Sequence, residues 1–515
     1  MQRLAAAVLC GLALTASFPP VGAYPLAFVA LVPLILAARA STAWGALALG
    51  WVAGATAYLT AWRWVWPTIA QLQDLSARAA FPWFVAFASY HALQLALFAL
   101  AAHGAHRGHA AASGAVRSDG LSNGSEACVL AAWWVLLEWA FARVIPWYLA
   151  DAVAASPRLR QLADIGGVYG LSFLIMAVNR LVAGALLEPR SRRLLPAGGA
   201  MWVVAGALFY GQARLGEWSR IDAPAHGWLR ISAVQGNLPW VRRADARTNR
   251  DAWRVYEDLT RSPGTVAADL IVWPETTLRV YLRDDGESLD RIAALMRGAG
   301  SAMLVGAPDR HSNGVDELNS AYLFVATEPP RIYHKRRLLA FGEQAPAALG
   351  WRTTGRFVAA ARDSPVTLVL PQSPNGGAGN IFAPSICFEA VFPGAYNAAV
   401  RAGATFLVNL TDDSWFGDTA EPYQHLNATI LRAIETRRWL VRASNSGVSA
   451  FVDPTGKIVA SLPFGNQGIL THSVLPSEAM TRYVRFGDWP VGLSCLLATV
   501  RLLRSWRRNE SRSRE

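Results

Sequence analysis

Lysine is almost absent from this chain of 515 residues. Of its 48 lysine and arginine residues, only Lys335 and Lys457 are lysines. Lys457 lies in DPTGKIV, a turn sequence in which a solvated lysine is ordinary. Arginine keeps its proton and spreads its charge, whereas lysine carries a compact charge and a tunable pKa. Lys335, in RIYHKRRLLAFGE, therefore suggests a position that needs a compact ammonium group.

Charged residues are also scarce, at 16% of the chain against about 25% in an ordinary globular protein. Long apolar runs fill the chain up to about Gly211, a water-soluble stretch follows, and one more apolar run precedes an arginine-rich tail. The sequence therefore predicts three parts. They are a membrane domain with seven spans at 1–213, a soluble domain at 214–487, and a last span with its tail at 488–515.

Eight apolar runs approach the roughly 20 residues that a helix needs to cross the bilayer core. They lie at 4–20, 24–38, 44–64, 82–103, 127–149, 163–188, 195–212 and 488–504. The first resembles a signal peptide, but the spans that follow at once favour a first membrane helix. The fifth carries Glu138 and Arg143, and ionisable residues at membrane depth usually face the bundle or a cavity.

Arginines in the short loops are concentrated on the side that holds both ends of the chain. By the positive-inside rule, eight spans then place both termini in the cytoplasm and the soluble domain outside it. The net charge of +12 follows largely from this bias and from the tail. No aromatic and basic motif accompanies the charge, so no nucleic-acid partner is expected.

Cysteine is scarce as well. Three of the four cysteines lie in or beside the apolar runs, at Cys10, Cys128 and Cys495. Cys387 is the only cysteine of the soluble domain, so it has no disulfide partner there, although a compartment outside the cytoplasm permits disulfides. A lone thiol is either a small packing residue, which is the commoner case, or a reactive group.

The soluble domain alternates strand-like and helix-like segments, which predicts a layered α/β domain. Strands are expected at 228–237, 268–277, 302–308, 321–326, 380–390 and 404–417, helices at 246–261, 286–298 and 421–438, and a hairpin at 441–461. Glu275 and Cys387 come toward the ends of the expected strands 268–277 and 380–390, and Lys335 follows the strand-like RIYH. Catalytic groups gather at strand ends in such sheets.

These three residues together fit acyl transfer. A carboxylate can take the proton of a thiol, a nearby cation favours the thiolate, and a compact ammonium can stabilise the oxyanion of an attacked carbonyl. Taken singly, each residue has an ordinary interpretation: a solvated carboxylate, part of a basic surface, and a packing cysteine. The combination is what points to chemistry.

The segments VWPETT, YHKRRLLAFGE and SICFEA resemble the signature segments of the nitrilase superfamily, with its Glu-Lys-Cys triad. With membrane spans on both sides, the chain is most similar to the apolipoprotein N-acyltransferase family. VQGNLP, DDSWFG, LRAIETRRWLVRASNSGVSAFVDPTG and RFGDW match that family in order. The resemblance implies an α-β-β-α sandwich carried by eight membrane helices of a bacterial inner membrane, with the active site in the periplasm and facing the membrane.

The resemblance also implies roles for single residues. Glu275 would be the general base, Lys335 the oxyanion stabiliser and Cys387 the nucleophile, with Glu343 and Glu389 as supporting carboxylates. Two departures from the family pattern concern substrate contacts. Phe388 stands where the family commonly has tyrosine, and Arg243-Ala244 stands where it has a Lys-Trp pair.

The reaction implied by the resemblance moves a fatty acyl chain from a membrane phospholipid to the α-amino group of the diacylglyceryl-cysteine of an apolipoprotein. It would pass through a thioester on Cys387, as the last step of lipoprotein maturation, and would need no cofactor. Two other functions stay open. One is a membrane-tethered amidase that uses the same triad with water as acceptor, and the other is a membrane scaffold or transporter with an inactive domain.

Two further segments have alternative interpretations. The stretch 341–357, FGEQAPAALGWRTTGRF, reads equally well as a lid that dips into the membrane interface or as an ordinary surface loop. His103, His106 and His109 are spaced across a Gly/Ala-rich loop and are expected to be solvated. No metal site is therefore expected.

Overall fold

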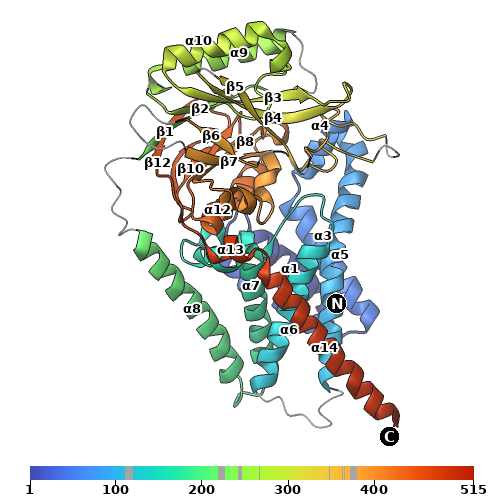
Figure 1. Cartoon of the computed structure of the whole chain (residues 1–515). Helices are drawn as coiled ribbons and strands as arrows, with labels where there is room; N and C mark the ends of the chain where they lie inside the picture. Colours follow the sequence, from blue (N-terminus) through green and yellow to red (C-terminus); the bar gives the residue numbers. More distant parts are fainter. Residues whose placement is uncertain are drawn as a thin grey trace.

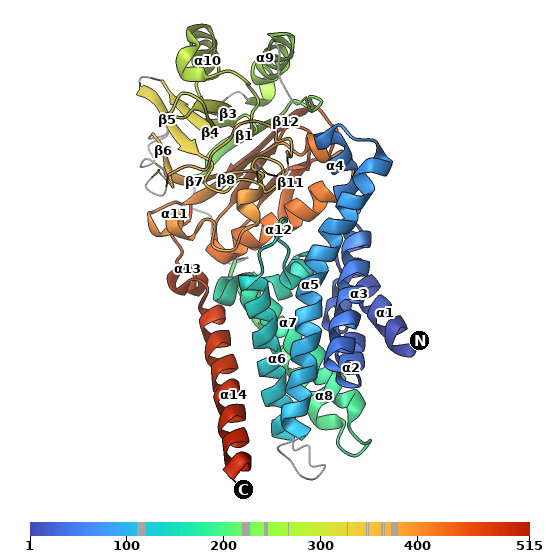
Figure 2. The same cartoon turned by 90° about the vertical axis from the view of Figure 1, so that its right-hand side faces the viewer.

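The computed structural model describes residues 1–110, 120–218, 227–241, 246–265, 267–326, 328–346, 348, 350–361, 364, 366–371 and 380–514. Figures 1 and 2 show a half made of long helices and, at one end of it, a half in which helices cover sheets. The last helix returns from the layered half and runs along the long helices (Figure 2). The predicted Arg243-Ala244 departure and Leu349 of the segment 341–357 lie outside the described residues.

The helical half consists of the first part of the chain and the C-terminal helix. Its elements are α1 (Gln2–Ser17), η1 (Tyr24–Phe28), α2 (Val32–Arg39), α3 (Ala43–Ala61), α4 (Val65–Gln73), α5 (Ala77–Ala110), α6 (Gly120–Ala140), η2 (Leu149–Ala155), η3 (Leu159–Leu162), α7 (Ala163–Leu187), α8 (Leu194–Trp218) and α14 (Trp489–Arg514). Among the described residues, three helical stretches are long and apolar enough to cross a membrane: Ala77–Ala105, Leu159–Leu187 and Leu194–Trp218. Gln2–Ser17 and Tyr24–Arg39 are apolar but shorter.

Small residues let the helices of this half approach closely. A Cβ on Gly50 of α3 would come within 2.4 Å of the Leu95 carbonyl oxygen on α5, and one on Gly54 within 2.6 Å of Ala92 Cα. No larger side chain fits at these two positions without moving a backbone. The α3–α5 contact is therefore of the small-residue type common between membrane helices.

Three of the predicted spans are not single helices. In the run 163–188, α7 is interrupted at Gly167, where φ is +59°. The run 24–38 is split into η1 and α2, and Pro33 lies in the first turn of α2, where a proline favours a new helix start. The run 127–149 is helical only up to Ala140, the end of α6. Beyond it the chain folds back, and the Leu149 N–H donates to Glu138 Oε1 at 2.8 Å.

The prediction of a solvated loop histidine at His103 is wrong. Helix α5 continues to Ala110, so His103 lies within it. Its side chain is buried, and its Nδ1 is 3.2 Å from the carbonyl oxygen of Ala38. The side chains of His106 and His109 lie outside the described part of the chain.

The layered half is built on two sheets, each of six strands in the described residues. The first has the order β12 (Gly468–Val474), β1 (Leu229–Gln235), β2 (Leu270–Val272), β3 (Ala302–Arg310), β4 (Glu317–Val325) and β5 (Glu328–His334). The second has the order β11 (Ile458–Leu462), β10 (Ser449–Val452), β9 (Leu440–Ser444), β8 (Phe406–Thr411), β7 (Asn380–Ile386) and β6 (Leu368–Leu370). The predicted hairpin at 441–461 is instead the three-stranded antiparallel run β9, β10 and β11.

Helices cover the outer face of each sheet, which gives four layers. On one side lie α9 (Ala246–Thr260) and α10 (Gly286–Ala299), and on the other α11 (Asn397–Arg401) and α12 (Glu421–Thr436) (Figures 1 and 2). Every residue of the central strand β8 is buried, as expected for a strand packed on both faces. The predicted α-β-β-α sandwich is thus confirmed.

The layered half rests on the helical half through α12 and the residues that follow it (Figures 1 and 2). Arg437, just after α12, donates through Nη2 to Asp164 Oδ2 at 2.6 Å and through Nη1 to Gln161 Oε1 at 2.6 Å. Arg214 of α8 donates to the same Asp164 oxygen at 3.0 Å. Both partners of the Asp164–Arg437 pair are almost fully buried, so the pair fixes the two halves at a desolvated contact.

Replacing Asp164 with Asn should destabilise the protein, because the Arg437 guanidinium would stay buried without its carboxylate. Removing one partner of a buried ion pair costs about 3–5 kcal/mol. The measurement is the thermal midpoint of the purified protein in detergent.

Asp284→Asn is the matched control. Asp284 pairs with Arg310 where the two side chains are 58% and 51% exposed, and such pairs contribute about 0–1 kcal/mol. Equal midpoints for the two variants would contradict the structural role of Asp164.

Candidate active site

The structure brings Glu275, Lys335 and Cys387 into one buried cluster. Glu275 follows β2, Lys335 follows β5, and Cys387 follows β7 of the other sheet. Lys335 Nζ donates to Glu275 Oε1 at 3.1 Å. Both charges also act on the Cys387 thiol, which comes from the other sheet, and all three residues are at most 7% exposed.

Glu343 completes the polar contacts of the lysine. Lys335 Nζ donates to Glu343 Oε1 at 2.8 Å, and the Leu339 N–H donates to Glu343 Oε2 at 2.8 Å. Asn319 of β4 bridges the two carboxylates through Nδ2, at 2.8 Å from Glu275 Oε1 and 2.9 Å from Glu343 Oε1. One ammonium thus lies between two carboxylates that share an amide donor.

Cys387 opens a short 3-10 helix, η7 (Cys387–Val391), directly after β7. Its φ is +54°, in the left-handed region that a residue with a side chain adopts at a cost of about 1–3 kcal/mol. The first amides of a helix have no partner within it, so the N–H groups beside Cys387 point away from the helix. A strained turn therefore presents the thiol at the end of a buried strand.

Two features set the pKa values in the cluster. All its groups are buried, and two carboxylates, Glu275 and Glu343, surround one ammonium, Lys335. Burial raises the pKa of the Cys387 thiol well above its ordinary value, Glu275 raises it further, and Lys335 opposes both. Burial also raises the pKa of Glu275, against the attraction of Lys335. For Lys335, burial lowers the pKa, but the two carboxylates outweigh burial and the pKa ends above its ordinary value. The lysine therefore stays charged, and Glu275 is the group best able to exchange a proton.

Glu389 ties the lysine loop to the cysteine turn. Its Oε1 accepts from the N–H groups of Arg336 and Arg337, at 2.7 and 3.1 Å. Its Oε2 accepts from the Ile386 N–H at 2.8 Å and from the Tyr333 hydroxyl at 2.9 Å. Burial raises the pKa of Glu389, and these donors oppose the rise. The Glu389 carboxylate therefore connects the residues flanking Lys335 to the residue before Cys387.

A second polar network contacts the backbone of Cys387. Two of its residues lie in segments that match the family, Asp413 in DDSWFG and Arg442 in LRAIETRRWLVRASNSGVSAFVDPTG, but the sequence gave no sign of their contacts. Asn409 of β8 donates to the Cys387 carbonyl oxygen at 3.2 Å and to Ser385 Oγ at 2.9 Å. Arg442 of β9 donates to Asn409 Oδ1 at 2.6 Å and to Asp413 Oδ2 at 2.8 Å. Asn409 therefore holds the carbonyl of the Cys387–Phe388 peptide, and Arg442 orients Asn409.

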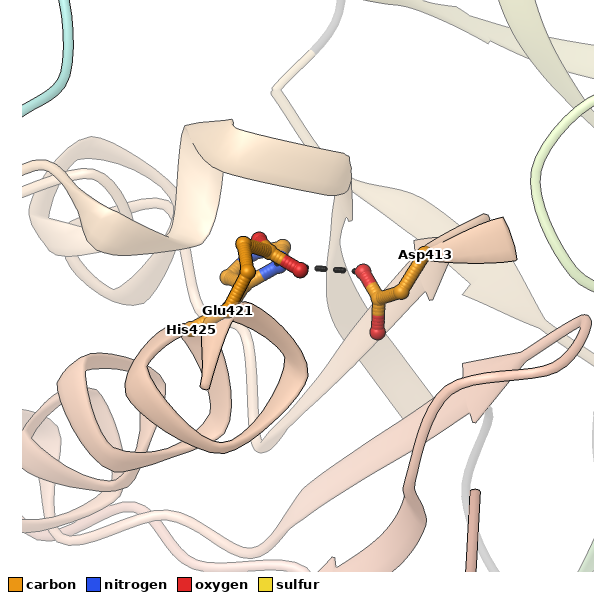
Figure 3. A group of neighbouring side chains, drawn as sticks. All are labelled: Asp413, Glu421 and His425. Carbon is orange, nitrogen blue, oxygen red and sulfur yellow. Dashed lines mark hydrogen bonds and ion pairs between the residues drawn. The ribbon is translucent and has the colours of Figure 1, made fainter. Parts of the chain in front are cut away.

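Asp413, Glu421 and His425 form the buried group of possible metal ligands drawn in Figure 3. His425 Nδ1 lies 3.2 Å from Asp413 Oδ1 and 3.5 Å from Glu421 Oε1. The Arg442 guanidinium already contacts this group, with Nη2 3.1 Å from His425 Nδ1. Burial raises the pKa of Glu421 well above its ordinary value, which favours a neutral carboxyl. Arg442 therefore supplies the positive charge that a metal ion would bring.

Two chambers lie near the cluster, one lined by Glu275 and Glu343 and the other reaching Phe388, the residue after Cys387. One, of about 940 Å³, has polar walls that include Glu275, Glu343, Arg279 and Asp412. The other, of about 510 Å³, is lined mostly by apolar side chains from α4, α5, the residues after α6 and the loop around 339–342. Phe388, next to Cys387, lines the apolar chamber, and its ring stacks on His425 at 4.5 Å. The site is thus placed between a polar and an apolar space.

Trp351 and Trp415 line both chambers. Trp351 belongs to the segment 341–357, and its Nε1 donates to the Phe341 carbonyl oxygen at 2.7 Å. Its ring packs edge-on against Trp83 of α5 at 5.3 Å. In the described residues this segment therefore lies between the layered half and the upper part of the helical half.

Comparisons with known proteins agree with this architecture. Residues 230–481 match the family model described as carbon-nitrogen hydrolase, and residues 10–181 match the one described as apolipoprotein N-acyltransferase N-terminal domain. The layered half with its Glu-Lys-Cys cluster therefore places the chain in the nitrilase-like class of enzymes. Among curated proteins, the apolipoprotein N-acyltransferase of Geobacter metallireducens is 32% identical over 94% of this chain and 91% of its own length.

Other relatives with the same name cover the chain equally well. The protein of Azotobacter vinelandii is 33% identical over 94% of this chain and 92% of its own. That of Pseudomonas syringae pv. tomato is 30% identical over 94% and 93%. The chain belongs to the apolipoprotein N-acyltransferase family, as the sequence segments indicated.

Charge changes at the cluster should move the reactivity of Cys387 in opposite directions. Lys335→Met removes the cation that lowers the thiol pKa, so the midpoint of the pH dependence of Cys387 alkylation by iodoacetamide should rise. Glu275→Gln removes a carboxylate that raises the thiol pKa, so the midpoint should fall. A neighbouring charge at this range moves a pKa by about 1–3 units.

The midpoint is measured by peptide mass spectrometry over a pH series, with Lys457→Met as the control. The pH midpoint reports thiolate formation independently of how easily the reagent reaches the buried thiol. Shifts of the same sign for Lys335→Met and Glu275→Gln would show that the described charges do not govern the thiol.

Proposed function

We propose that this chain transfers a fatty acyl group from a membrane phospholipid to the α-amino group of the diacylglyceryl-cysteine of an apolipoprotein. Glu275, Lys335 and Cys387 are the catalytic residues of this proposal. The observation that carries it is the position of the buried Glu-Lys-Cys cluster beside an apolar chamber whose walls come partly from the helical half. Membership of the apolipoprotein N-acyltransferase family supports the same conclusion.

The first half-reaction loads the enzyme. Glu275 takes the proton of Cys387, and the sulfur attacks the carbonyl carbon of a phospholipid ester. The negative charge that develops on the carbonyl oxygen is stabilised by the Lys335 ammonium and the Phe388 N–H. When the ester C–O bond breaks, Glu275 returns its proton to the departing oxygen, and a lysophospholipid leaves. The acyl chain remains on Cys387 as a thioester.

The second half-reaction transfers the acyl group from Cys387 to the acceptor. The neutral α-amino group of the acceptor attacks the thioester carbonyl, a C–N bond forms, and the C–S bond breaks. The proton lost by the amine passes through Glu275 to the thiolate of Cys387. Donor and acceptor use the same nucleophile in turn, which predicts ping-pong kinetics.

Glu343, Glu389 and Phe388 have supporting roles in this proposal. Glu343 holds the Lys335 ammonium together with Glu275, so the lysine is placed before substrate arrives. Glu389 fixes the turns on both sides of the cluster. Phe388 contributes its backbone N–H to the oxyanion and its ring to the apolar chamber. The acyl chain of the thioester would lie in that chamber, because each buried CH₂ contributes about 0.8 kcal/mol.

The membrane placement is part of the same proposal. Eight helical spans would cross a bacterial inner membrane, with both termini in the cytoplasm and the catalytic domain in the periplasm. The loop arginines support this topology by the positive-inside rule. The domain limits that go with it are 1–213 for the first seven spans, 214–487 for the catalytic domain and 488–515 for the last span and its tail.

The segment 341–357 is the proposed lid of the site. Its support comes from Trp351, which lines both chambers and packs against Trp83 of α5. Gln73, the last residue of α4, and Arg352 exchange two hydrogen bonds of 2.8 and 3.0 Å. Opening of this segment would let a lipid pass from the membrane interface to the chamber without leaving the bilayer.

An amidase with the same triad is the less supported alternative. Such an enzyme passes its acyl group to water and has no use for an apolar chamber that reaches into the helical half. The walls of this chamber, formed by α4 and α5, therefore favour a lipid donor over a small soluble amide.

The proposal is tested by two-substrate kinetics of the full-length protein in detergent, with a labelled phospholipid and a synthetic diacylglyceryl-cysteinyl peptide. Acylated peptide should form with parallel lines in double-reciprocal plots, as ping-pong kinetics require. Cys387→Ala should abolish product, and Cys495→Ala, a cysteine of α14 outside the cluster, should not. Release of free fatty acid without acylated peptide would favour the amidase.

A further inference from the structure

The apolar chamber has one charged residue among its described lining residues, Arg143. The other walls are aliphatic and aromatic side chains, with Thr68 and Tyr90 as the polar additions. Arg143 follows α6, in the stretch that folds back toward Glu138. A cation facing an apolar space is costly unless an anion or a set of fixed dipoles compensates it.

The guanidinium is held by neutral groups. It donates to the backbone carbonyl oxygens of Glu138 and Trp147, and it lies over the Tyr148 ring, 4.4 Å from the ring centroid. The Glu138 carboxylate is turned elsewhere, because its Oε1 accepts from Trp134 Nε1 and from the Leu149 N–H, both at 2.8 Å. Among the described residues no carboxylate lies within ion-pair distance of Arg143.

These contacts fix the position of the cation and leave part of it available. A guanidinium carries five N–H donors in a rigid fork, and the two backbone acceptors do not use them all. The ring and the carbonyls orient the group beside the chamber. The charges of Glu138 and Asp151 act on it from a distance, but neither carboxylate takes up its remaining donors. The arrangement is suited to a phosphate group, which arginine binds through several parallel hydrogen bonds.

We propose that Arg143 binds the phosphodiester of the phospholipid acyl donor. This inference rests on the proposed acyl transfer and names the group that selects its donor. Phe388, beside the nucleophile, lines the same chamber as Arg143. In this proposal the phosphate lies at Arg143, the acyl chain follows the apolar walls, and the ester carbonyl reaches Cys387 past Phe388. The chemistry recognised is a phosphate group next to an acyl ester.

The test compares two acyl donors, dioleoylphosphatidylglycerol and the neutral dioleoylglycerol, in detergent with the full-length protein. The readout is the rate of acyl-Cys387 formation by intact mass against donor concentration. Arg143→Gln should raise the half-saturating concentration of the phospholipid about tenfold and leave that of dioleoylglycerol unchanged. Arg143→Lys, which keeps the charge, should raise the half-saturating concentration of the phospholipid by less than Arg143→Gln does. It should leave that of dioleoylglycerol unchanged. Arg78→Gln removes an exposed arginine of α5 and should change neither donor.

Inorganic phosphate distinguishes a site for any phosphate from a site for a lipid phosphate. If it competes with the phospholipid in the wild type and not in Arg143→Gln, the site accepts the phosphate group alone. If it does not compete, while Arg143→Gln is selective for the phospholipid, the phosphate is recognised only as part of the lipid. Both results agree with an anion site at Arg143.

Two failures have different meanings. Equal slowing of both donors by Arg143→Gln and by Arg143→Lys, with an active wild type, would overturn the role of Arg143 and leave a structural one. A wild type that acquires no acyl group on Cys387 from either donor would instead count against the proposed function itself.

Discussion

The rest of the site depends on one buried lysine held between two carboxylates. Lys335 lies 3.1 Å from Glu275 and 2.8 Å from Glu343, and its side chain is 1% exposed. Burying an ammonium is affordable only when it is paired and hydrogen-bonded, so the strands that carry these residues have to meet. Asn319 donates to the carboxylate of Glu275, and Glu389 accepts from the backbone beside Lys335. Cys387 lies beside this cluster in a turn with a positive φ.

The apolar chamber depends on contact between the layered half and the helical half. The chamber beside Phe388 has walls from both, so the apolar surface next to the nucleophile exists only when the two halves are in contact. Buried polar contacts such as Arg437 with Asp164 set that contact. An α/β sandwich alone would keep the triad but lose the space for an acyl chain. The contact between the two halves therefore places the Glu-Lys-Cys cluster of a nitrilase-like domain beside a space suited to a lipid donor.

Much of this could be predicted from the sequence, because the chemistry is carried by short segments at strand ends. Glu275, Lys335 and Cys387 each follow a strand, and period and turn residues mark strands well. The limits of single spans were harder: Pro33 starts a new helix, and α6 ends at Ala140 because the chain folds back on Glu138. Hydrophobicity alone predicts neither the helix start at Pro33 nor the helix end at Ala140. The roles of Asn409 and Arg442 could not be found, although Arg442 lies in a segment that matches the family. Both residues lie inside strands, and their roles depend on partners distant in sequence.

The central claim is that Cys387 carries the acyl group. Its most direct measurement is the intact mass of the purified protein after incubation with phospholipid, for the wild type and for Cys387→Ala. The account predicts a fatty-acyl increment on the wild type that hydroxylamine removes, and no increment on the variant. An increment that persists in Cys387→Ala, or a wild type that stays unmodified while a thiol reagent still labels Cys387, would contradict it.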